Sequence, residues 1–258
     1  MRFHQLEHII DTHNPDFIGI QETKVDDENF PREDIENLGY HVEFFGQKTH
    51  YGVALLTKFP FKKCQKGFPN DAQDAQRRFI AGDFELENGK TITVMNGYFP
   101  QGESRTHLTK FPNKQKYYEN LYQYINENYT KSDSLVVMGD VNVCPADIDI
   151  GIGDDNKKRW LKSEKCSFLP EEQQWLSQLM DWGLVDSYRQ IHPDVHDKYS
   201  WFDYRSKGFD REPKRGLRID LILATEALSQ NCADAGIDYD ARAMEKPSDH
   251  CPIWAEYT

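Results

Sequence analysis

The sequence predicts an α/β protein of the α+β type, with β-sheets packed on each other and helices on the outside. Short apolar strand patterns outnumber helical ones along the 258-residue chain. Several of these strand patterns follow one another with no helical pattern between them, whereas repeated strand–helix–strand units would alternate the two. No repeat, low-complexity tract or linker interrupts the chain, so we expect a single domain over residues 1–258.

The expected elements follow in chain order. A helix is expected over residues 3–14, and Asn14-Pro15 ends it because a residue before proline is pushed out of the helical region. A short buried strand follows at residues 17–20, and the clearest later strands cover residues 51–57, 78–86, 91–96, 135–139, 217–224 and 252–257. Two further helices are expected at residues 113–128 and 170–182, the second opening on Pro-Glu-Glu, a favourable first turn.

Charge and composition exclude several classes of protein. Lys and Arg total 31 against 43 Asp and Glu, and the net charge of -12 excludes a generally basic DNA-coating protein but not a local basic groove. No apolar run is long enough to cross a membrane, and the first ten residues lack a secretory signal pattern. The five cysteines are dispersed without a paired motif, which favours reduced thiols in a cytoplasm.

Polar side chains lie at the end, in the interior or at the start of five of the expected strands. A carboxylate in or beside a buried strand costs several kcal/mol unless it is paired or binds a metal. Five separate sites of this kind fit one shared pocket better than five independent coincidences. The residues concerned are Glu22, Asn96, Tyr98, Asp140, Asn142, Asp220, Asp249 and His250.

The residue types at these positions limit the metal that such a pocket could hold. Glu22, Asp140, Asn142 and Asp249 offer hard oxygen donors, which suit Mg²⁺ or Mn²⁺. No thiolate cluster suits zinc, and no Gly-x-x-x-x-Gly-Lys-Ser/Thr motif indicates a P-loop NTPase. A hard divalent ion with His and Tyr nearby is typical of phosphoryl transfer.

The motifs resemble the exonuclease III family, the bacterial branch of the exonuclease–endonuclease–phosphatase superfamily. The matching stretches cover nearly the whole chain and together are highly specific. They are Gln21-Glu22-Thr23-Lys24, Gly46-Gln47-Lys48, Tyr51-Gly52-Val53-Ala54, Gln76-Arg77-Arg78, Asn96-Gly97-Tyr98-Phe99-Pro100-Gln101-Gly102-Glu103-Ser104, Gly139-Asp140-Val141-Asn142, Trp201-Phe202-Asp203-Tyr204-Arg205, Gly216-Leu217-Arg218-Ile219-Asp220 and Glu245-Lys246-Pro247-Ser248-Asp249-His250.

The resemblance implies a four-layer α/β sandwich, with two packed mixed sheets flanked by helices, and a role for each site residue. It implies catalytic roles for Tyr98, Asp140, Asn142, Asp220 and His250, and a metal site drawn from Glu22, Asp140, Asn142, Asp249 and His250. Asp220 would fix His250, since a buried carboxylate on one ring nitrogen selects the tautomer and raises the basicity of the ring. Whether Asp140 or His250 is the base remains open at the level of sequence.

A local DNA-binding surface is expected despite the acidic total. Residues 200–218 hold six basic and three acidic residues, and residues 154–165 form a second, weaker basic island. Aromatic residues beside cations suit an enzyme that reads the DNA backbone. Together with the resemblance, this pattern assigns DNA contacts to Arg77, Arg78, Gln101, Trp201, Phe202 and Arg205.

The resemblance implies a Mg²⁺-dependent DNA-repair nuclease, with Mn²⁺ as a substitute ion. It would act as a 3′→5′ exonuclease on double-stranded DNA, as an endonuclease at abasic sites and as a 3′-phosphatase. The expected substrate is double-stranded DNA with 3′ ends or abasic sites, and the protein is expected to be a monomer in a bacterial cytoplasm, without a membrane. Two alternatives stay open: a catalytically weakened DNA-binding homologue, and a phosphodiesterase acting on phosphoesters other than DNA.

One feature of the family pattern is absent. The family normally opens with an apolar strand and an Asn-containing turn before the first helix, and no such segment precedes residue 3. We therefore expect the sandwich to lack its first strand, with reduced stability and activity relative to a chain that has it, because neighbouring strands would keep unpaired ladder groups.

Overall fold

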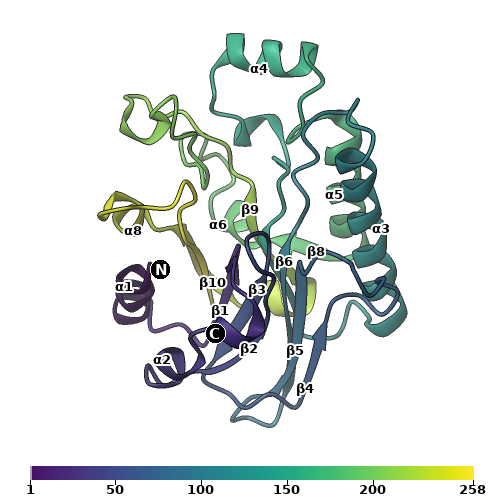
Figure 1. Cartoon of the computed structure of the whole chain (residues 1–258), viewed down its shortest axis with the longest axis vertical. Helices are drawn as coiled ribbons and strands as arrows, with labels where there is room; N and C mark the ends of the chain where they lie inside the picture. The colour runs from purple at the N-terminus through teal and green to yellow at the C-terminus, as the bar shows by residue number, and fades with distance from the viewer. Residues whose placement is uncertain (1) are drawn as a thin grey trace.

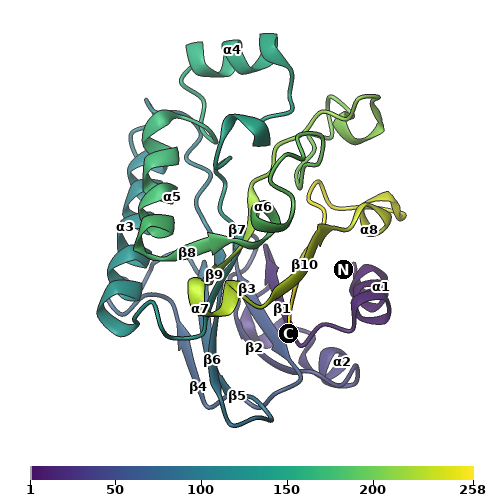
Figure 2. The same ribbon diagram turned by 180° about the vertical axis from the view of Figure 1, so that it is seen from behind.

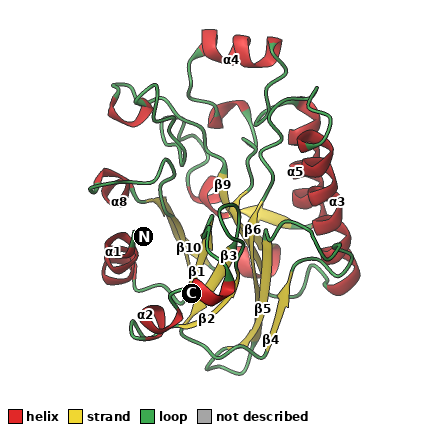
Figure 3. Cartoon of the chain, viewed as in Figure 1, coloured by secondary structure: helices red, strands yellow, loops and turns green. Residues whose placement is uncertain are grey.

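Two layers of β-sheet lie face to face in the computed structural model, which describes residues 2–258 (Figures 1 and 3). The larger layer is a six-stranded sheet. Its strands, in spatial order, are β4 (Lys63–Lys66), β5 (Phe79–Glu85), β6 (Thr91–Tyr98), β7 (Leu135–Asp140), β9 (Asp220–Thr225) and β8 (Leu184–Asp186). The predicted mixed α/β sandwich is confirmed, because β6 and β7 pair in parallel and every other pair in this sheet is antiparallel.

The second layer consists of two smaller sheets. One contains β1 (Phe17–Gln21), β3 (Val53–Thr57) and β2 (His41–Phe45) in the order β1-β3-β2, and the other pairs β10 (Cys232–Ile237) with β11 (Ile253–Tyr257). Strand β1 packs over β6 and β7, and β11 packs against β9. Within residues 2–258, β1 and β11 have no strand partner besides β3 and β10, respectively.

Helices cover the outer faces of both layers, which completes the predicted four layers. Helices α3 (Lys110–Asn128) and α5 (Pro170–Trp182) run side by side along the large sheet, and α1 (Phe3–His13) and α2 (Arg32–Glu36) lie on the opposite side (Figures 1 and 2). The remaining helices are α4 (Asp154–Lys162), α6 (Ser187–Ile191), α7 (Glu226–Ser229) and α8 (Tyr239–Ala243), with 3₁₀ turns η1 (Asp27–Asn29), η2 (Asp147–Asp149) and η3 (Gly208–Asp210). Among residues 2–258, no helix has the length and apolar character that a membrane span needs.

Two helix ends show how local sequence sets the elements. Helix α1 ends where expected, because Asn14 takes a left-handed conformation (φ 45°) and its N–H bonds the carbonyl of Ile10. Helix α3 begins at Lys110, three residues before the predicted start at residue 113. The ring nitrogen Nδ1 of His107 accepts the backbone N–H groups of Thr109 and Lys110, which satisfies the first turn.

The core lies in the spaces between these layers. Strand β3 is buried at all five positions because one of its faces packs on the large sheet and the other faces the outer helices. Val53 and Leu55 pack against Ile80, Val94 and Val136 of the large sheet. A second apolar cluster fills the space between the large sheet and helices α3 and α5, so the sheet is buried on both faces. This packing fixes the strand register, on which the site depends.

Candidate active site

One row of the strand register brings three polar side chains together. Tyr98 at the end of β6 is paired with Asp140 at the end of β7, and Asp140 is paired with Asp220 at the start of β9. The parallel pairing of β6 with β7 and the antiparallel pairing of β7 with β9 put these three positions at the same edge of the sheet. Gly139 allows this approach, because a Cβ on it would lie 2.0 Å from the carbonyl oxygen of Gly97 and its φ of 135° favours glycine.

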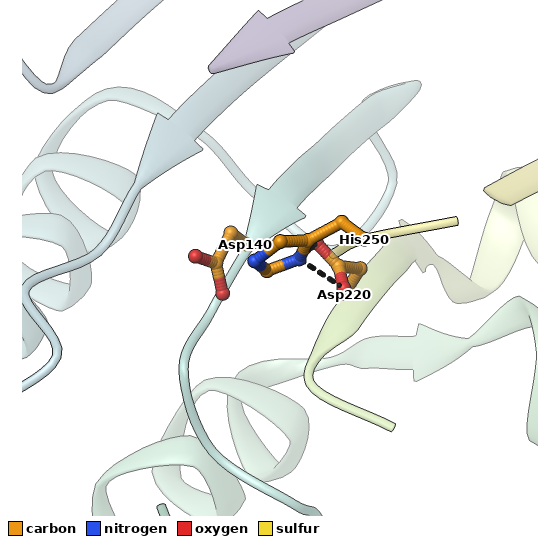
Figure 4. Close-up of side chains that lie close together, drawn as sticks. All are labelled: Asp140, Asp220 and His250. Atoms are coloured by element: carbon orange, nitrogen blue, oxygen red, sulfur yellow. Dashed lines mark hydrogen bonds and ion pairs between the residues drawn. The ribbon is translucent and has the colours of Figure 1, made fainter. Parts of the chain in front are cut away.

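His250 completes this group from the loop that precedes β11. Its Nδ1 donates to both carboxylate oxygens of Asp220, at 2.9 and 3.0 Å. Figure 4 shows the imidazole lying between the two carboxylates, with its second ring nitrogen on the side of Asp140. The side chains of Asp140, Asp220 and His250 offer ligand atoms within 4.8 Å of one another. The expectation that a buried aspartate holds this histidine therefore agrees with the geometry.

The surroundings of Asp140 and His250 shift the pKa of each residue for different reasons. Burial, reinforced by the nearby charges of Asp220 and Glu22, raises the pKa of Asp140 to about 7, although His250 and the N–H of Asn142 oppose the shift. Burial lowers the pKa of His250, but the carboxylates of Asp220, Asp140 and Asp249 outweigh it, so the pKa lies above its usual value. At neutral pH the imidazole is therefore protonated while the carboxyl of Asp140 can exchange its proton.

Asn142 orients the Asp140 carboxylate from the turn after β7. Its backbone N–H donates to Oδ1 of Asp140 at 3.0 Å, and its Nδ2 donates to Oδ2 at 2.8 Å and to the Phe99 carbonyl at 3.0 Å. The turn is held in the left-handed region, with φ of 55° at Asn142. A non-glycine residue keeps this conformation only where its surroundings impose it. Asn142 thus fixes the direction in which Asp140 presents its oxygens.

Glu22 comes directly after β1, which belongs to the second sheet layer. Its φ is also positive, at 55°. The Tyr98 hydroxyl donates to its carboxylate, and Lys24 forms an ion pair with it at 2.8 Å. Burial alone would raise the pKa of Glu22, but these two partners hold it below its usual value. Glu22 is charged, half-exposed and close enough to Asp140 to raise the pKa of that residue.

Asp249 is held beside the site by Trp201. The indole Nε1 of Trp201 donates to Oδ2 of Asp249 at 3.2 Å, and the backbone N–H of Phe202 donates to the Asp249 carbonyl at 2.8 Å. Trp201 is partly exposed and forms a bridge pair with His250. Its ring is therefore anchored to the reacting group at one edge.

Two residues that were expected to contact DNA, Phe202 and Arg78, are buried, which corrects the prediction for both. Phe202 is 0% exposed and packs against Tyr199, Phe209 and Tyr239, so it is a core residue that offers no surface to DNA. Arg78 is 8% exposed, and its guanidinium lies 4.0 and 4.5 Å from the ring centres of Tyr51 and Tyr98. Arg78 thus supports Tyr98 from within the protein and is not placed to meet a phosphate directly.

The other expected DNA contacts lie at the surface. Arg77 forms a half-exposed ion pair with Asp27 at 2.9 Å. Gln101 is exposed, and its side-chain oxygen accepts the N–H of Glu103 at 2.7 Å. Arg205 is exposed on the turn capped by Asp203. These three remain predictions of DNA contact.

A basic pocket is lined on one side by Trp201, the residue that also pairs with His250. It has a volume of about 280 Å³ and is formed between α4 and the loop that follows Trp201. Two tryptophans, one aspartate and three arginines are among its lining residues, and the described chain shows no ion pair between these arginines and a carboxylate. The full lining is Ile152, Asn156, Arg159, Trp160, Trp201, Asp203, Ser206, Arg211 and Arg215. Both basic islands of the sequence contribute to this pocket, although Arg205 does not line it.

Sequence reasoning missed three residues that hold the site from behind. The hydroxyl of Ser200 accepts the N–H groups of Ile219 and Asp220, both at 3.0 Å. Arg218 and Lys114 are fully buried in ion pairs beneath the site. One signal was available for Lys114, because it lies on the same helical stripe as Tyr117, Leu121 and other apolar residues of α3.

The donor set suits a hard divalent cation. Two carboxylates that are 4% and 7% exposed, Asp140 and Asp220, lie close together, and the pKa of Asp140 is raised by burial and, to a lesser extent, by the charge of Asp220. A bound cation would offset the repulsion between the two carboxylates, and oxygen donors favour Mg²⁺-like ions. Asp220 holds His250 with both oxygens, so Asp140, Glu22 and Asp249 are the other carboxylates that could bind the cation. They already accept hydrogen bonds from Asn142, Tyr98 and Trp201, respectively, but each carboxylate has further lone pairs.

The chain is similar to known nucleases over nearly its whole length. A model of the Endonuclease/Exonuclease/phosphatase family matches residues 2–250. Exodeoxyribonuclease III of Haemophilus influenzae is 60% identical over 256 residues, which cover 99% of this chain and 95% of that protein. A solved structure of the 3′ phosphatase NExo from Neisseria bound to a product DNA hairpin has 35% identity, covers 100% of this chain and 94% of its own, and superposes with a TM-score of 0.88. An AP endonuclease from Archaeoglobus fulgidus has 34% identity and a TM-score of 0.88, with 99% and 94% of the two chains covered. The resemblance drawn from the motifs is confirmed.

Proposed function

Since the chain belongs to the Endonuclease/Exonuclease/phosphatase family, we propose that it is a Mg²⁺-dependent DNA-repair nuclease of the exodeoxyribonuclease III type. It removes nucleotides 3′→5′ from duplex DNA, cuts beside abasic sites and clears 3′ phosphates. The relatives support these three activities, since they include an exodeoxyribonuclease, an AP endonuclease and a 3′ phosphatase. The observation that carries the proposal is the row Tyr98–Asp140–Asp220 with His250 seated against it.

The pKa shifts of Asp140 and His250 support different catalytic roles for these two residues. In-line hydrolysis needs a group that takes a proton from water and a group that stabilises charge on the phosphoryl oxygens. Burial and the neighbouring carboxylates raise the pKa of Asp140, so its carboxylate accepts a proton more readily than an ordinary aspartate does. The pKa of His250 is raised by its carboxylate neighbours, so the ring is a protonated donor that faces the phosphate. We therefore assign Asp140 as the base and His250 as the phosphate-stabilising group.

Tyr98 and Asn142 complete the reacting surface. The Tyr98 hydroxyl donates to Glu22, while Arg78 beneath the ring fixes the position of Tyr98. Asn142 holds both oxygens of Asp140 in place through its backbone and side-chain N–H groups. These two residues keep the carboxylates of Glu22 and Asp140 fixed before any substrate arrives, which reduces the reorganisation needed during the reaction.

The residues that would hold the cation are Glu22, Asp140, Asn142 and Asp249, with His250 nearby. When bound there, Mg²⁺ neutralises the carboxylates and the phosphoryl oxygens and favours attack on phosphorus. Mn²⁺, with the same preference for oxygen donors, would substitute.

The basic pocket beside Trp201 supports double-stranded DNA as the substrate. Its three arginines carry positive charge toward solvent at the edge of the site, although the whole chain is acidic. Cations of this kind meet phosphates, and an exposed indole can stack or wedge against a nucleotide. We propose that DNA contacts here extend to Arg77, Gln101 and Arg205.

The proposal extends to the domain organisation, the oligomeric state and the cellular compartment of the enzyme. We propose that residues 1–258 act as one domain, as a monomer in a bacterial cytoplasm. The five cysteines are dispersed in the sequence without a paired motif, which favours a reducing compartment.

The test is a comparison of defined substrates with Mg²⁺ present. We expect release of mononucleotides from the 3′ ends of a blunt duplex, one cut 5′ to the lesion in an abasic duplex, and loss of phosphate from a 3′-phosphorylated end. Asp140→Asn should abolish all three, while Asp11→Asn, on the exposed face of α1, should leave them unchanged. Binding of DNA without cleavage, or hydrolysis of a phospholipid or inositol phosphate with inert DNA, would contradict the proposal.

A further inference from the structure

Lys114 and Glu172 form an ion pair that is completely enclosed by the protein. Both side chains are 0% exposed, and Nζ lies 2.5 Å from Oε1 of Glu172. A fully buried lysine is rare, and a buried pair contributes little net stability compared with apolar residues of similar size. The pair joins α3 to α5 beneath the site, but the reaction described above does not use it.

Every proton of the Lys114 ammonium has a defined acceptor. Besides Glu172, it donates to the backbone carbonyl of Asn142 at 2.9 Å and to that of Gln101 at 3.3 Å. The second oxygen of Glu172 accepts the N–H groups of Ser167 and Leu169, both at 2.8 Å. Glu172 is thereby tied to the start of α5, and it anchors the ammonium at one point.

The two carbonyls that Lys114 holds belong to the two loops that border the reacting group. Asn142 is in a left-handed turn (φ 55°), and its N–H groups orient both oxygens of Asp140. Gln101 lies in the loop that follows β6, three residues after Tyr98. A single ammonium therefore holds the backbone just after the end of β6 and just after the end of β7.

Gly102 packs closely against the Lys114 side chain. Gly102 has a φ of 88°, and a Cβ there would lie 3.0 Å from Cδ of Lys114 and 2.8 Å from Sγ of Cys166. The loop therefore passes against the aliphatic part of Lys114 at a distance that only glycine permits in this conformation.

We propose that Lys114 is a positioning residue for the reaction, which holds the Asn142 turn and the Gln101 loop so that Asp140 faces the phosphate. This inference rests on the proposed function. Glu172 acts as the anchor of the ammonium, and the carbonyl of Asn142 is the point through which Lys114 acts on Asp140.

The test removes both charges at once while keeping the volume of the pair. In the double variant Lys114→Met/Glu172→Gln, the glutamine oxygen can still accept the N–H groups of Ser167 and Leu169. We expect a melting temperature close to that of the parent, a KM for an abasic duplex within about twofold, and a kcat reduced about 10–100-fold, as for other residues that orient a reacting group. A kcat equal to that of the parent would overturn the inference.

Two further variants keep the result interpretable. Lys116→Met, on the exposed face of the same helix, should match the parent in kcat and KM. If the double variant does not fold, Glu172→Gln decides the question, because the glutamine oxygen can keep the bonds to Ser167 and Leu169 while the charge that anchors the ammonium is lost. A kcat reduced about tenfold with little change in KM then supports the inference, and a kcat equal to that of the parent overturns it. A parent that cleaves no DNA would instead refute the proposed function.

Discussion

Asp220 accepts hydrogen bonds from Nδ1 of His250 through both carboxylate oxygens, at 2.9 and 3.0 Å. The backbone that carries this carboxylate is held by Ser200, whose hydroxyl accepts the N–H groups of Ile219 and Asp220. The ring of His250 is thus held in one orientation, with the second nitrogen turned to Asp140 (Figure 4). The catalytic assignment depends on this relationship.

Asp220→Asn should lower kcat on an abasic duplex by about 10–100-fold, the usual cost of removing a group that orients a histidine. An amide cannot accept the Nδ1 proton with two equivalent oxygens, and it carries no charge to keep the ring protonated. Steady-state kinetics with Mg²⁺ in excess measure the effect. An unchanged kcat, in a variant whose circular dichroism matches that of the parent, would show that Asp220 does not support His250.

The pH dependence of stability should report the same pair. Because its folded-state pKa is raised, the protonated His250 contributes stability that is fully present below about pH 6.5 and is lost as the pH rises through the folded pKa. In metal-free protein, the melting temperature of the parent should therefore exceed that of His250→Gln most at pH 6. The difference should shrink in alkaline solution, and a difference that grows toward pH 10 would have the wrong sign.

Arg218 should be among the most sensitive positions for folding. It is 1% exposed; its Nε contacts Asp149 at 2.6 Å, and its two terminal nitrogens contact Asp186 at 2.6 and 3.2 Å. Arg218→Met leaves two buried carboxylates short of their partner, and we expect a loss of about 3–5 kcal/mol in the free energy of unfolding.

An exposed ion pair provides the contrast for that measurement. Arg32 and Glu36 are about half exposed, and Arg32→Met should cost less than about 1 kcal/mol. Urea denaturation of both variants compares the two effects. Equal losses in the two variants would show that burial does not determine the contribution of Arg218.

The sequence predicted the sandwich because apolar strand patterns and strand-end polar residues are local features. It missed β2, β4, β8 and β10, which lie at sheet edges. Of these, β4 and β10 also carry few strongly β-forming residues. Strand β10 reads Cys-Ala-Asp-Ala-Gly-Ile, for example, and is a strand mainly because β11 pairs with it. Edge strands of this kind are set by tertiary pairing, which no local pattern contains.

The main site residues could also be predicted because they belong to local sequence patterns, whereas features that depend on tertiary contacts could not. Asp140, Asp220 and His250 were found because each stands beside an apolar run. The burial of Phe202 and Arg78 could not be found in this way, since a basic or aromatic residue beside a strand looks alike whether it faces solvent or the core. The roles of Lys114 and Ser200 depend on contacts with residues far away in the chain, and only the fold reveals them.

The most direct test of the account is the initial rate of cleavage of an abasic duplex by the parent and by Asp140→Asn, each freed of metal with EDTA and then given excess Mg²⁺. We predict no cleavage by either protein before Mg²⁺ is added. With Mg²⁺, the parent should cut 5′ to the abasic site and the variant should be slower by at least about 1,000-fold, because it lacks both the base and a ligand oxygen. Cleavage by the parent in EDTA, or a variant as fast as the parent in Mg²⁺, would contradict the assignment of this site.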